Sequence, residues 1–507
     1  MMMKYYHQFS LTSRYKLLII LLALLGAVFI LLSTAPYGAG LSSDSVDYIS
    51  AARSIMRGAG VCYYDGTPLV WFPPLYPALL ALIGKIIGSD PISFAHFVNA
   101  FLFALTIYLG GLLILKYQLS SVLLIIIGTL AIVFSKSLFI ISVMVWSEAL
   151  FICVALLSIN FAYSYITKND MTSLILFSLS VAILPLIRYV GVILILWGLV
   201  VIFFYNRSAG FKNKIVHLAL FTIISVLPIG LWLIRNYLSS GTLFGPRMSS
   251  LGSNYSLSHN IVHALYVIVI WYAPILLFCC AGACFVYAHI GKEIWRFIQA
   301  EFHHTGPVIL FVIIFTAFIV LSGTPLHLGQ IDNRLLSPVY VPLTLLLLIL
   351  TQFIVKYSQK FVSGKLIYLI LVIGIFIWLL YPPYTVLGDV VDQFHNGDGY
   401  SGRIWKSSPT VQYLCNHHIS ESENTYYSNG AETTYILANF ISKLSPDKLI
   451  SVKQLQGSWP TENKAYFIQL NNINRTGLYT INELMEIANF NLIVRFDDGA
   501  IYRITKK

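Results

Sequence analysis

PYGAGLSSDSVDYISAARSIMRGAGVCYYDGTPLVWFPPLYP, residues 36–77, is the first long polar stretch in a chain that is otherwise mostly apolar. It carries the carboxylates of Asp44, Asp47 and Asp65 and the guanidinium groups of Arg53 and Arg57. Ionisable groups next to membrane-compatible segments are costly to hold there, and they commonly mark a functional site. We therefore interpret this loop as the candidate site and the remaining chain as its support.

The composition around this loop is that of an integral membrane protein. Of the 507 residues, 57% are hydrophobic and only 10% are charged, with a mean hydropathy of +0.77. Soluble proteins carry about 25% charged residues. The formal net charge of +11 fits basic residues at cytoplasmic helix ends, so membrane lipid is the expected environment and nucleic acid is not an expected partner.

About eleven apolar segments approach the length of about 20 residues that a membrane-spanning helix needs. They are 17–35, 92–115, 119–134, 142–166, 171–187, 189–205, 215–234, 262–289, 306–322, 335–355 and 366–382. Residues 75–88 are too few to span and include Lys85, so we expect a helix along the interface. Residues 171–205 are predicted to form two helices, because one helix would bury Arg188 and contain Pro185.

The distribution of basic residues orients the predicted helices. With two helices in 171–205, all the basic clusters fall on the side where the chain begins: Lys4/Arg14/Lys16, Lys116, Lys168, Arg207/Lys212/Lys214, Lys292/Arg296 and Lys356/Lys360/Lys365. By the positive-inside rule that side is cytoplasmic. We therefore predict a protein of the cell's inner or plasma membrane with a cytoplasmic N-terminus and an extracytoplasmic C-terminal region.

The composition changes after Tyr384 to that of a small water-soluble domain. Thr480-Ile-Asn-Glu483 is a capping box that predicts a short helix. Residues 492–496 and 500–504, on either side of Asp497-Asp498-Gly499, predict a hairpin, and 426–428 and 465–469 predict further strands. We expect residues 1–384 to form the membrane domain, with 36–91 as its outer loop, and 385–507 to form an extracytoplasmic α/β domain.

Further ionisable residues fall at the outer ends of later predicted helices. They are Glu148 in VWSEALF, Arg188 in LIRYVG, Arg235 in WLIRNY, Arg247 in the following loop, and Asp332 and Arg334 in IDNRLL. Arginine suits a phosphate, because its planar fork gives paired, charged hydrogen bonds and does not deprotonate. This face is therefore a candidate site for a phosphate-bearing substrate.

Structural explanations for the same residues stay open. The two acids that begin DSVDYISAARSIMRG complement a helix dipole, with the basic residues at its other end. Glu148 is a partner for Lys136 in the preceding turn. Asp332 and Arg334 are close enough in sequence to pair with each other, and single arginines at helix ends often only reach for the interface.

The order and sidedness of these segments resemble the GT-C superfamily of glycosyltransferases that use polyprenyl-phosphate sugars. The resemblance is to the branch that holds the protein O-mannosyltransferases, the bacterial transferases that add aminoarabinose to lipid A, and related bacterial enzymes. The resemblance rests on SSDSVDY and PPLYP in the first loop, WSEALF, LIRYVG, WLIRNYLSSGTLFGPR and DNRLLSPVYVPL, between Leu17 and Tyr384. Many members have Asp-Glu in the first loop, whereas Asp44 is followed here by Ser45, and Asp47 is the next acid.

The resemblance implies a polytopic α-helical GT-C fold that transfers a hexosyl or pentosyl group from a polyprenyl-phosphate donor, with inversion. The acceptor is a hydroxyl of a lipid, glycan or protein. Asp44 is then the predicted catalytic base, and the predicted substrate- or phosphate-binding residues are Asp47, Arg53, Arg57, Glu148, Arg188, Arg235, Arg247, Asp332 and Arg334. A divalent cation, Mg²⁺ or Mn²⁺, on Asp44, Asp47 or Glu148 is a further candidate.

Two other classes of function remain as alternatives. A transporter or flippase of lipid-linked glycans predicts charged residues along a path through the middle of the membrane, whereas those found here gather near one face. A glycan ligase or polymerase that uses lipid-pyrophosphate donors shares the substrate chemistry. The position of the acidic loop directly after the first span argues against that second class.

Overall fold

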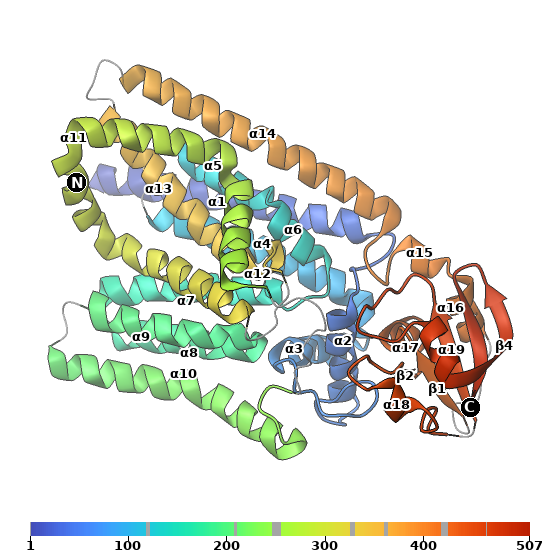
Figure 1. Cartoon of the computed structure of the whole chain (residues 1–507). Helices are drawn as coiled ribbons and strands as arrows, with labels where there is room; N and C mark the ends of the chain where they lie inside the picture. Colours follow the sequence, from blue (N-terminus) through green and yellow to red (C-terminus); the bar gives the residue numbers. More distant parts are fainter. Residues whose placement is uncertain are drawn as a thin grey trace.

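The structure, a computed structural model, describes residues 2–117, 122–206, 210–245, 255–324, 330–358, 364–416, 424–462 and 464–507. Long helices form one part of the molecule, and a small sheet domain lies at one end of them (Figure 1). The helices of the first part are α1 (Met2–Thr34), α2 (Ser43–Met56), α3 (Leu75–Ile87), α4 (Pro91–Lys116), α5 (Val122–Val133), α6 (Lys136–Val143), α7 (Glu148–Lys168), α8 (Met171–Ile187), η1 (Tyr189–Val192), α9 (Ile193–Tyr205), α10 (Phe211–Ser240), α11 (Leu257–Gly323), α12 (Asn333–Leu336), η2 (Ser337–Val339), α13 (Tyr340–Ser358) and α14 (Gly364–Asn396).

Seven helices of the described chain are long and apolar enough to cross a membrane, or eight if the bent pair α5–α6 is one span. These coincide with eight of the predicted segments. Shorter apolar helices correspond to the predicted segments 171–187 and 189–205 and to the interfacial 75–88. The predicted segment 262–289 begins in a shorter apolar part of α11, Leu257–Ala273. The chain is therefore an integral membrane protein. The prediction for 142–166 is wrong at its start, because Met144–Ser147 is not helical and α7 begins at Glu148.

The predicted break within 171–205 is confirmed. Helix α8 contains Pro185 and ends at Arg188, whose φ of −146° and ψ of 133° are extended. The chain then turns through η1 into α9, and Gly191 packs so closely that a Cβ there would lie 2.5 Å from the Leu184 carbonyl carbon. The break places Arg188 at a helix end instead of inside an apolar helix.

Helix α11 differs from the prediction of two separate spans, 262–289 and 306–322. Its 67 residues form one helix that curves and returns, so that its ends approach each other (Figure 1). Asn260 Nδ2 near the start donates to Thr324 Oγ1 just past the end at 3.2 Å. The Thr324 hydroxyl in turn donates to the Tyr255 carbonyl at 2.7 Å. The two predicted spans are thus the two arms of one bent helix.

The C-terminal domain has a five-stranded sheet with the order β2-β1-β3-β5-β4. Strand β1 is parallel to β2 and β3, whereas β5 is antiparallel to β3 and β4. The elements are α15 (Arg403–Lys406), α16 (Pro409–Asn416), β1 (Thr425–Ser428), α17 (Ala431–Ala438), β2 (Lys443–Leu444), α18 (Val452–Leu455), β3 (Ala465–Leu470), α19 (Ile481–Ile487), β4 (Ala488–Phe496) and β5 (Gly499–Lys506). The predicted hairpin, the two predicted strands and the capping box at Thr480 are confirmed.

Two connections fix the sheet domain against the membrane domain. Helix α14 continues without a break through Tyr384 to Asn396 and leads into the sheet domain. The turn that follows binds the start of the outer loop, since Tyr400 N donates to the Leu41 carbonyl at 2.7 Å and Ser401 Oγ donates to the Ala39 carbonyl at 2.9 Å. Helix α2 therefore lies between the membrane domain and the sheet domain.

Candidate active site

Helix α2 is positioned by its own sequence. Ser42 is the N-cap and forms a capping box with Ser45, which satisfies backbone N–H groups at the helix start. Val46, Ile49 and Ala52 lie on one face and are fully buried. Asp44 is in the first turn, where the helix dipole favours a negative charge.

The segment before α7 is brought to α2 by backbone hydrogen bonds. Gly40 N donates to the Val143 carbonyl at 2.8 Å, and Val145 N donates to the Gly40 carbonyl at 2.9 Å. A Cβ on Gly40 would lie 2.3 Å from the Met144 sulfur and 2.9 Å from Asp398 Cβ, so glycine favours this close approach. The pairing places the start of WSEALF beside the start of α2.

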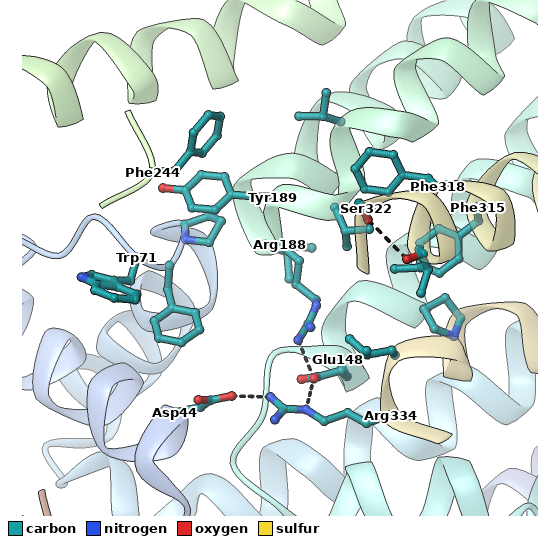
Figure 2. A pocket seen from close by; sticks show the side chains of 18 of the residues that line it. Asp44, Trp71, Glu148, Arg188, Tyr189, Phe244, Phe315, Phe318, Ser322 and Arg334 are labelled. Carbon is teal, nitrogen blue, oxygen red and sulfur yellow. Dashed lines mark hydrogen bonds and ion pairs between the residues drawn. The ribbon is translucent and has the colours of Figure 1, made fainter. Parts of the chain in front are cut away.

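Four predicted residues meet in one ion cluster (Figure 2). Arg334 Nη2 lies 2.5 Å from Asp44 Oδ2, and Arg334 Nε donates to Glu148 Oε1. Arg188 Nη1 lies 2.5 Å from the same Glu148 oxygen. The Glu148 side chain is only 2% exposed, whereas the other three are partly open to solvent. The cluster holds two carboxylates and two guanidinium groups, so its formal charges cancel.

Residues next to Glu148 hold the two arginines in place. The Trp146 ring lies 3.9 Å from the guanidinium carbon of Arg334, a cation–π contact, and its Nε1 donates to Ser42 Oγ at 2.7 Å. Ser147 Oγ accepts from Arg188 Nη1 at 3.2 Å and lies 2.9 Å from the Tyr48 hydroxyl. Trp146 and Ser147 belong to WSEALF, but they were not predicted from the sequence as site residues.

The ion cluster forms one end of a cavity with a volume of about 370 Å³. Most of the remaining lining is aromatic or aliphatic: Tyr48, Trp71, Phe72, Pro73, Ile187, Tyr189, Val190, Val192, Phe244, Phe315, Phe318, Ile319, Ser322, Leu335 and Pro338. In Figure 2, Trp71, Tyr189 and Phe244 lie on one side of Arg188, and Phe315 and Phe318 lie on the other. An apolar cavity with a few converging charges is typical of a small-molecule or cofactor site.

Arg235 supports the wall of the cavity from outside. It donates to the backbone carbonyls of Leu69 at 2.7 Å and Val61 at 3.0 Å, and its guanidinium carbon lies 4.7 Å from the Trp232 ring. The neighbouring Tyr189 hydroxyl donates to the Val70 carbonyl at 2.8 Å. These contacts hold the strand-like segment that leads to Trp71.

Three other predicted residues do not line the cavity. Arg53 makes two bonds to Asp90, at 2.7 and 3.1 Å. Arg57 is the exposed C-cap of α2, and Asp332 is the N-cap of α12, where it accepts from Leu335 N at 3.0 Å. Asp332 does not take Arg334 as its partner, and Lys136 pairs with Asp389 at 3.0 Å instead of Glu148. Arg247 lies outside the described residues.

Asp47 shares α2 with Asp44 but has different surroundings. Burial raises the pKa of its carboxyl well above the ordinary value, and the negative charges of Glu432, Asp44 and Asp65 add to the shift, while Arg475 opposes it. Glu432 belongs to the sheet domain, and Asp47 is not among the residues that line the cavity. The helix therefore presents one acid to the cavity and the other towards the sheet domain.

The predicted cation site on Asp44, Asp47 or Glu148 stays a prediction. Within the described ranges, no three His, Cys, Asp or Glu side chains are grouped so that they could hold a metal ion. Asp44 and Glu148 are both engaged by Arg334, and Asp47 lies outside the cavity lining. The positive charge that faces a ligand in this cavity comes from Arg188 and Arg334.

The helical membrane domain, the loop helix beside its cavity and the appended sheet domain together have the GT-C fold of membrane glycosyltransferases. The structure is similar to that of ArnT, an aminoarabinose transferase, from Cupriavidus metallidurans. For the apo state the TM-score is 0.61 and the identity 12%, over 97% of this chain and 98% of that chain. For the state bound to undecaprenyl phosphate they are 0.63 and 12%, over 96% and 97%.

Other comparisons add little to this likeness. The Pmt1-Pmt2 protein O-mannosyltransferase complex of S. cerevisiae, bound to its sugar donor, has a TM-score of only 0.36, with 20% identity over 49% of this chain and 36% of that chain. No protein-family model and no curated protein matches the sequence. At these identities the likeness establishes the fold, and the chemistry has to be argued from the residues of the cavity.

Proposed function

We propose that this chain is a membrane glycosyltransferase that moves a sugar from a polyprenyl-phosphate donor to an acceptor hydroxyl at the extracytoplasmic face. The observation that carries the proposal is the position of the Asp44 carboxylate beside two arginines at one end of a mainly apolar cavity. A lipid phosphate that carries a sugar has the matching parts: an apolar chain, an anionic group and a reactive carbon next to it.

Arg188 and Arg334 are the proposed phosphate-binding residues. Both line the cavity, and Arg334 uses Nε and Nη2 for the two carboxylates, which leaves N–H groups of its planar fork for a phosphate oxygen. The structure of ArnT with undecaprenyl phosphate supports a polyprenyl phosphate as the ligand class. The aromatic and aliphatic lining suits the lipid chain.

Asp44 is the proposed base for the transfer step. It accepts the proton of the acceptor hydroxyl as the acceptor oxygen forms a bond to the anomeric carbon. The bond from that carbon to the phosphate oxygen breaks, and its electron pair stays on the departing polyprenyl phosphate. Arg188 and Arg334 stabilise this developing charge. A single displacement from the opposite face inverts the anomeric centre.

The proposed orientation follows from the basic residues of the sequence. They gather at the end of the helices opposite to the ion cluster, which supports an extracytoplasmic position of the cavity and the sheet domain at the inner or plasma membrane. This location removes the enzyme from cytoplasmic nucleotide sugars. It is consistent with a lipid-linked donor and with a lipid, glycan or protein acceptor.

The test is a transfer assay with the purified protein in lipid nanodiscs. A panel of radiolabelled polyprenyl-phosphate sugars is incubated with membrane extract as the source of acceptor, for the wild type, Asp44→Asn and Asp65→Asn. Asp65 is a matched control, because it is an exposed acid of the same loop that only accepts bonds from Thr67.

We expect the wild type and Asp65→Asn to move label to a new product and Asp44→Asn to lose this activity. The labelled product also identifies the donor sugar and the class of acceptor. Normal transfer by Asp44→Asn would contradict the role of this residue. In a second assay with the protein reconstituted in vesicles, donor that reaches the opposite leaflet, with no transfer in the first assay, would overturn the proposal in favour of a transporter.

A further inference from the structure

The Glu148 carboxylate has one oxygen that the ion cluster does not use. Oε1 accepts from both Arg188 and Arg334, whereas Oε2 is buried and has no hydrogen-bond partner among the described residues. The whole residue is 1% exposed and lines the cavity, and Figure 2 shows its two oxygens with contacts to one only. A buried carboxylate oxygen without a partner is costly, so it calls for an explanation.

The chemistry of a carboxylate limits what this oxygen can bind. An ionised carboxylate only accepts hydrogen bonds, and it repels a phosphate that carries the same sign of charge. The missing partner is therefore a group with an O–H or N–H bond. Glu148 was predicted from the sequence among the residues for substrate or phosphate, and its surroundings favour the uncharged or cationic part of the substrate.

The same residue also holds the two proposed phosphate-binding arginines, so this oxygen lies beside the phosphate position. In a glycosyl phosphate the sugar ring begins one bond from the phosphate oxygen. Its ring substituents therefore lie next to whichever group binds the phosphate. Hydroxyl and amino substituents of the sugar are therefore the candidate O–H and N–H donors for this oxygen.

We propose that Glu148 Oε2 accepts a hydrogen bond from a hydroxyl or amino group of the transferred sugar, while Oε1 holds Arg188 and Arg334 for the phosphate. This inference rests on the proposed function. It makes Glu148 a residue that distinguishes the sugar-bearing lipid from the bare lipid phosphate, which is the product of the reaction.

The proposal predicts that one substitution changes the affinities for two lipids in opposite directions, because the two lipids respond differently to the charge of Glu148. The empty cluster is neutral, and a lipid phosphate adds negative charge to it. Replacement of Glu148 by glutamine removes one negative charge beside the phosphate and places an amide where the sugar needs an acceptor. The variant should bind bare polyprenyl phosphate as well as the wild type or more tightly, and should bind the sugar-bearing lipid more weakly.

A buried water is the main competing explanation for the free oxygen. The Tyr76 hydroxyl is also buried and without a partner in the described part of the chain, and Glu148 contributes to raising its pKa, after burial and Tyr48. A water between the two groups would satisfy both. Tyr76→Phe is therefore the matched control, because it removes the second group and leaves the carboxylate.

The experiment measures the affinity of nanodisc-embedded protein for undecaprenyl phosphate and for the polyprenyl-phosphate sugar that the wild type transfers. For Glu148→Gln we expect about a tenfold loss for the sugar-bearing lipid, the size of one charged hydrogen bond, and no loss for undecaprenyl phosphate. Tyr76→Phe should leave both affinities within about twofold.

Each other outcome has a distinct meaning. Equal weakening of both lipids by Glu148→Gln would show that the residue only positions the arginines, and unchanged affinity for both would show that Oε2 meets only water. Either result overturns the inference and leaves the transferase proposal intact. If the wild type binds neither lipid, the proposed function itself fails, and this inference fails with it.

Discussion

The two sides of α2 use the same kinds of residue for different purposes. Asp44 faces the cavity, where Arg334 binds it and the lining is mostly apolar. On the other side, the negative charge of Glu432 acts on Asp47, and the guanidinium carbon of Arg53 lies 5.4 Å from the centre of the Tyr435 ring. Glu432 and Tyr435 belong to the sheet domain. One helix thus carries a proposed catalytic group on one side and a domain contact on the other.

The sheet domain packs against the side of α2 that faces away from the cavity. Tyr435 is 4% exposed and packs in a hydrophobic cluster with Val46, Ile49 and Ala52 of α2. Its ring also stacks on Tyr64 of the outer loop, with a centroid distance of 4.6 Å. The sheet domain therefore supports the helix that carries Asp44. Substitutions on the two sides of this helix should change the transfer activity by different amounts.

The largest effect is expected on the cavity side, from Arg334→Met. This change removes the proposed phosphate ligand and leaves Asp44 and the buried Glu148 without their shared cation. We expect kcat/KM to fall by about 100-fold or more, as for loss of a group that stabilises a developing oxyanion. Arg53→Met is the control on the other side of the helix, and the transfer assay should show a much smaller loss there.

A smaller effect is expected from Tyr435→Ala on the domain side. The loss of the stacked ring should loosen α2 and lower kcat by about threefold to tenfold, since an aromatic pair contributes about 1 kcal/mol beyond its buried area. Because Tyr435 does not line the cavity, the affinity for undecaprenyl phosphate should not change. Tyr435→Phe keeps the ring and should restore kcat. If it does not, the claim that the ring of this residue supports α2 is contradicted.

The pH dependence of stability should come from the domain side. The pKa of Asp47 is raised in the folded protein, so folding favours its protonated form. Ionisation of Asp47 therefore destabilises the folded protein. This destabilisation is absent below the pKa of the unfolded state, about 3.9, and it grows as the pH rises towards the pKa of the folded state. Asp47→Asn should therefore raise the Tm by a few degrees at pH 7 and leave it unchanged near pH 4.

That comparison of Tm values also has a contradictory outcome. If Asp47→Asn lowers the Tm at pH 7, the ionised carboxylate has a stabilising partner. That result would contradict a raised pKa of Asp47 in the folded protein. Glu432→Gln provides the matched control, because Glu432 is the largest of the neighbouring charges that raise the pKa of Asp47.

The smallest effect is expected from metal removal. Since Arg188 and Arg334 line the cavity and are the proposed source of its positive charge, incubation with EDTA should change the transfer rate by less than about twofold. A loss that added Mg²⁺ or Mn²⁺ restores would show that a cation contributes to the step.

Local features of the fold could be predicted from the sequence because neighbours in the chain determine them. The break at Arg188 followed from Pro185, and the helix at Thr480 followed from its capping box. The continuity of α11 could not be predicted in this way, because the basic cluster Lys292/Arg296 predicts a boundary between the spans 262–289 and 306–322.

The site shows the same limit. The sequence supplied Asp44, Glu148, Arg188 and Arg334 as candidates, but not their partners, because Asp44 and Arg334 are 290 residues apart. Asp44 and Asp47 are three residues apart, a spacing that favours a shared helix face. Three residues correspond to about 300° of rotation, and the remaining 60° is enough to turn Asp47 towards a domain whose position the sequence does not give.

The most direct test of this account compares Asp44→Asn and Asp47→Asn in the same transfer assay at saturating donor. Both variants remove one carboxylate from the same helix and keep its shape. We expect Asp44→Asn to lower kcat by at least about 100-fold with undecaprenyl phosphate affinity retained, as for loss of a general base, and Asp47→Asn to stay within about threefold of the wild type. Equal losses in the two variants, or normal turnover by Asp44→Asn, would contradict it.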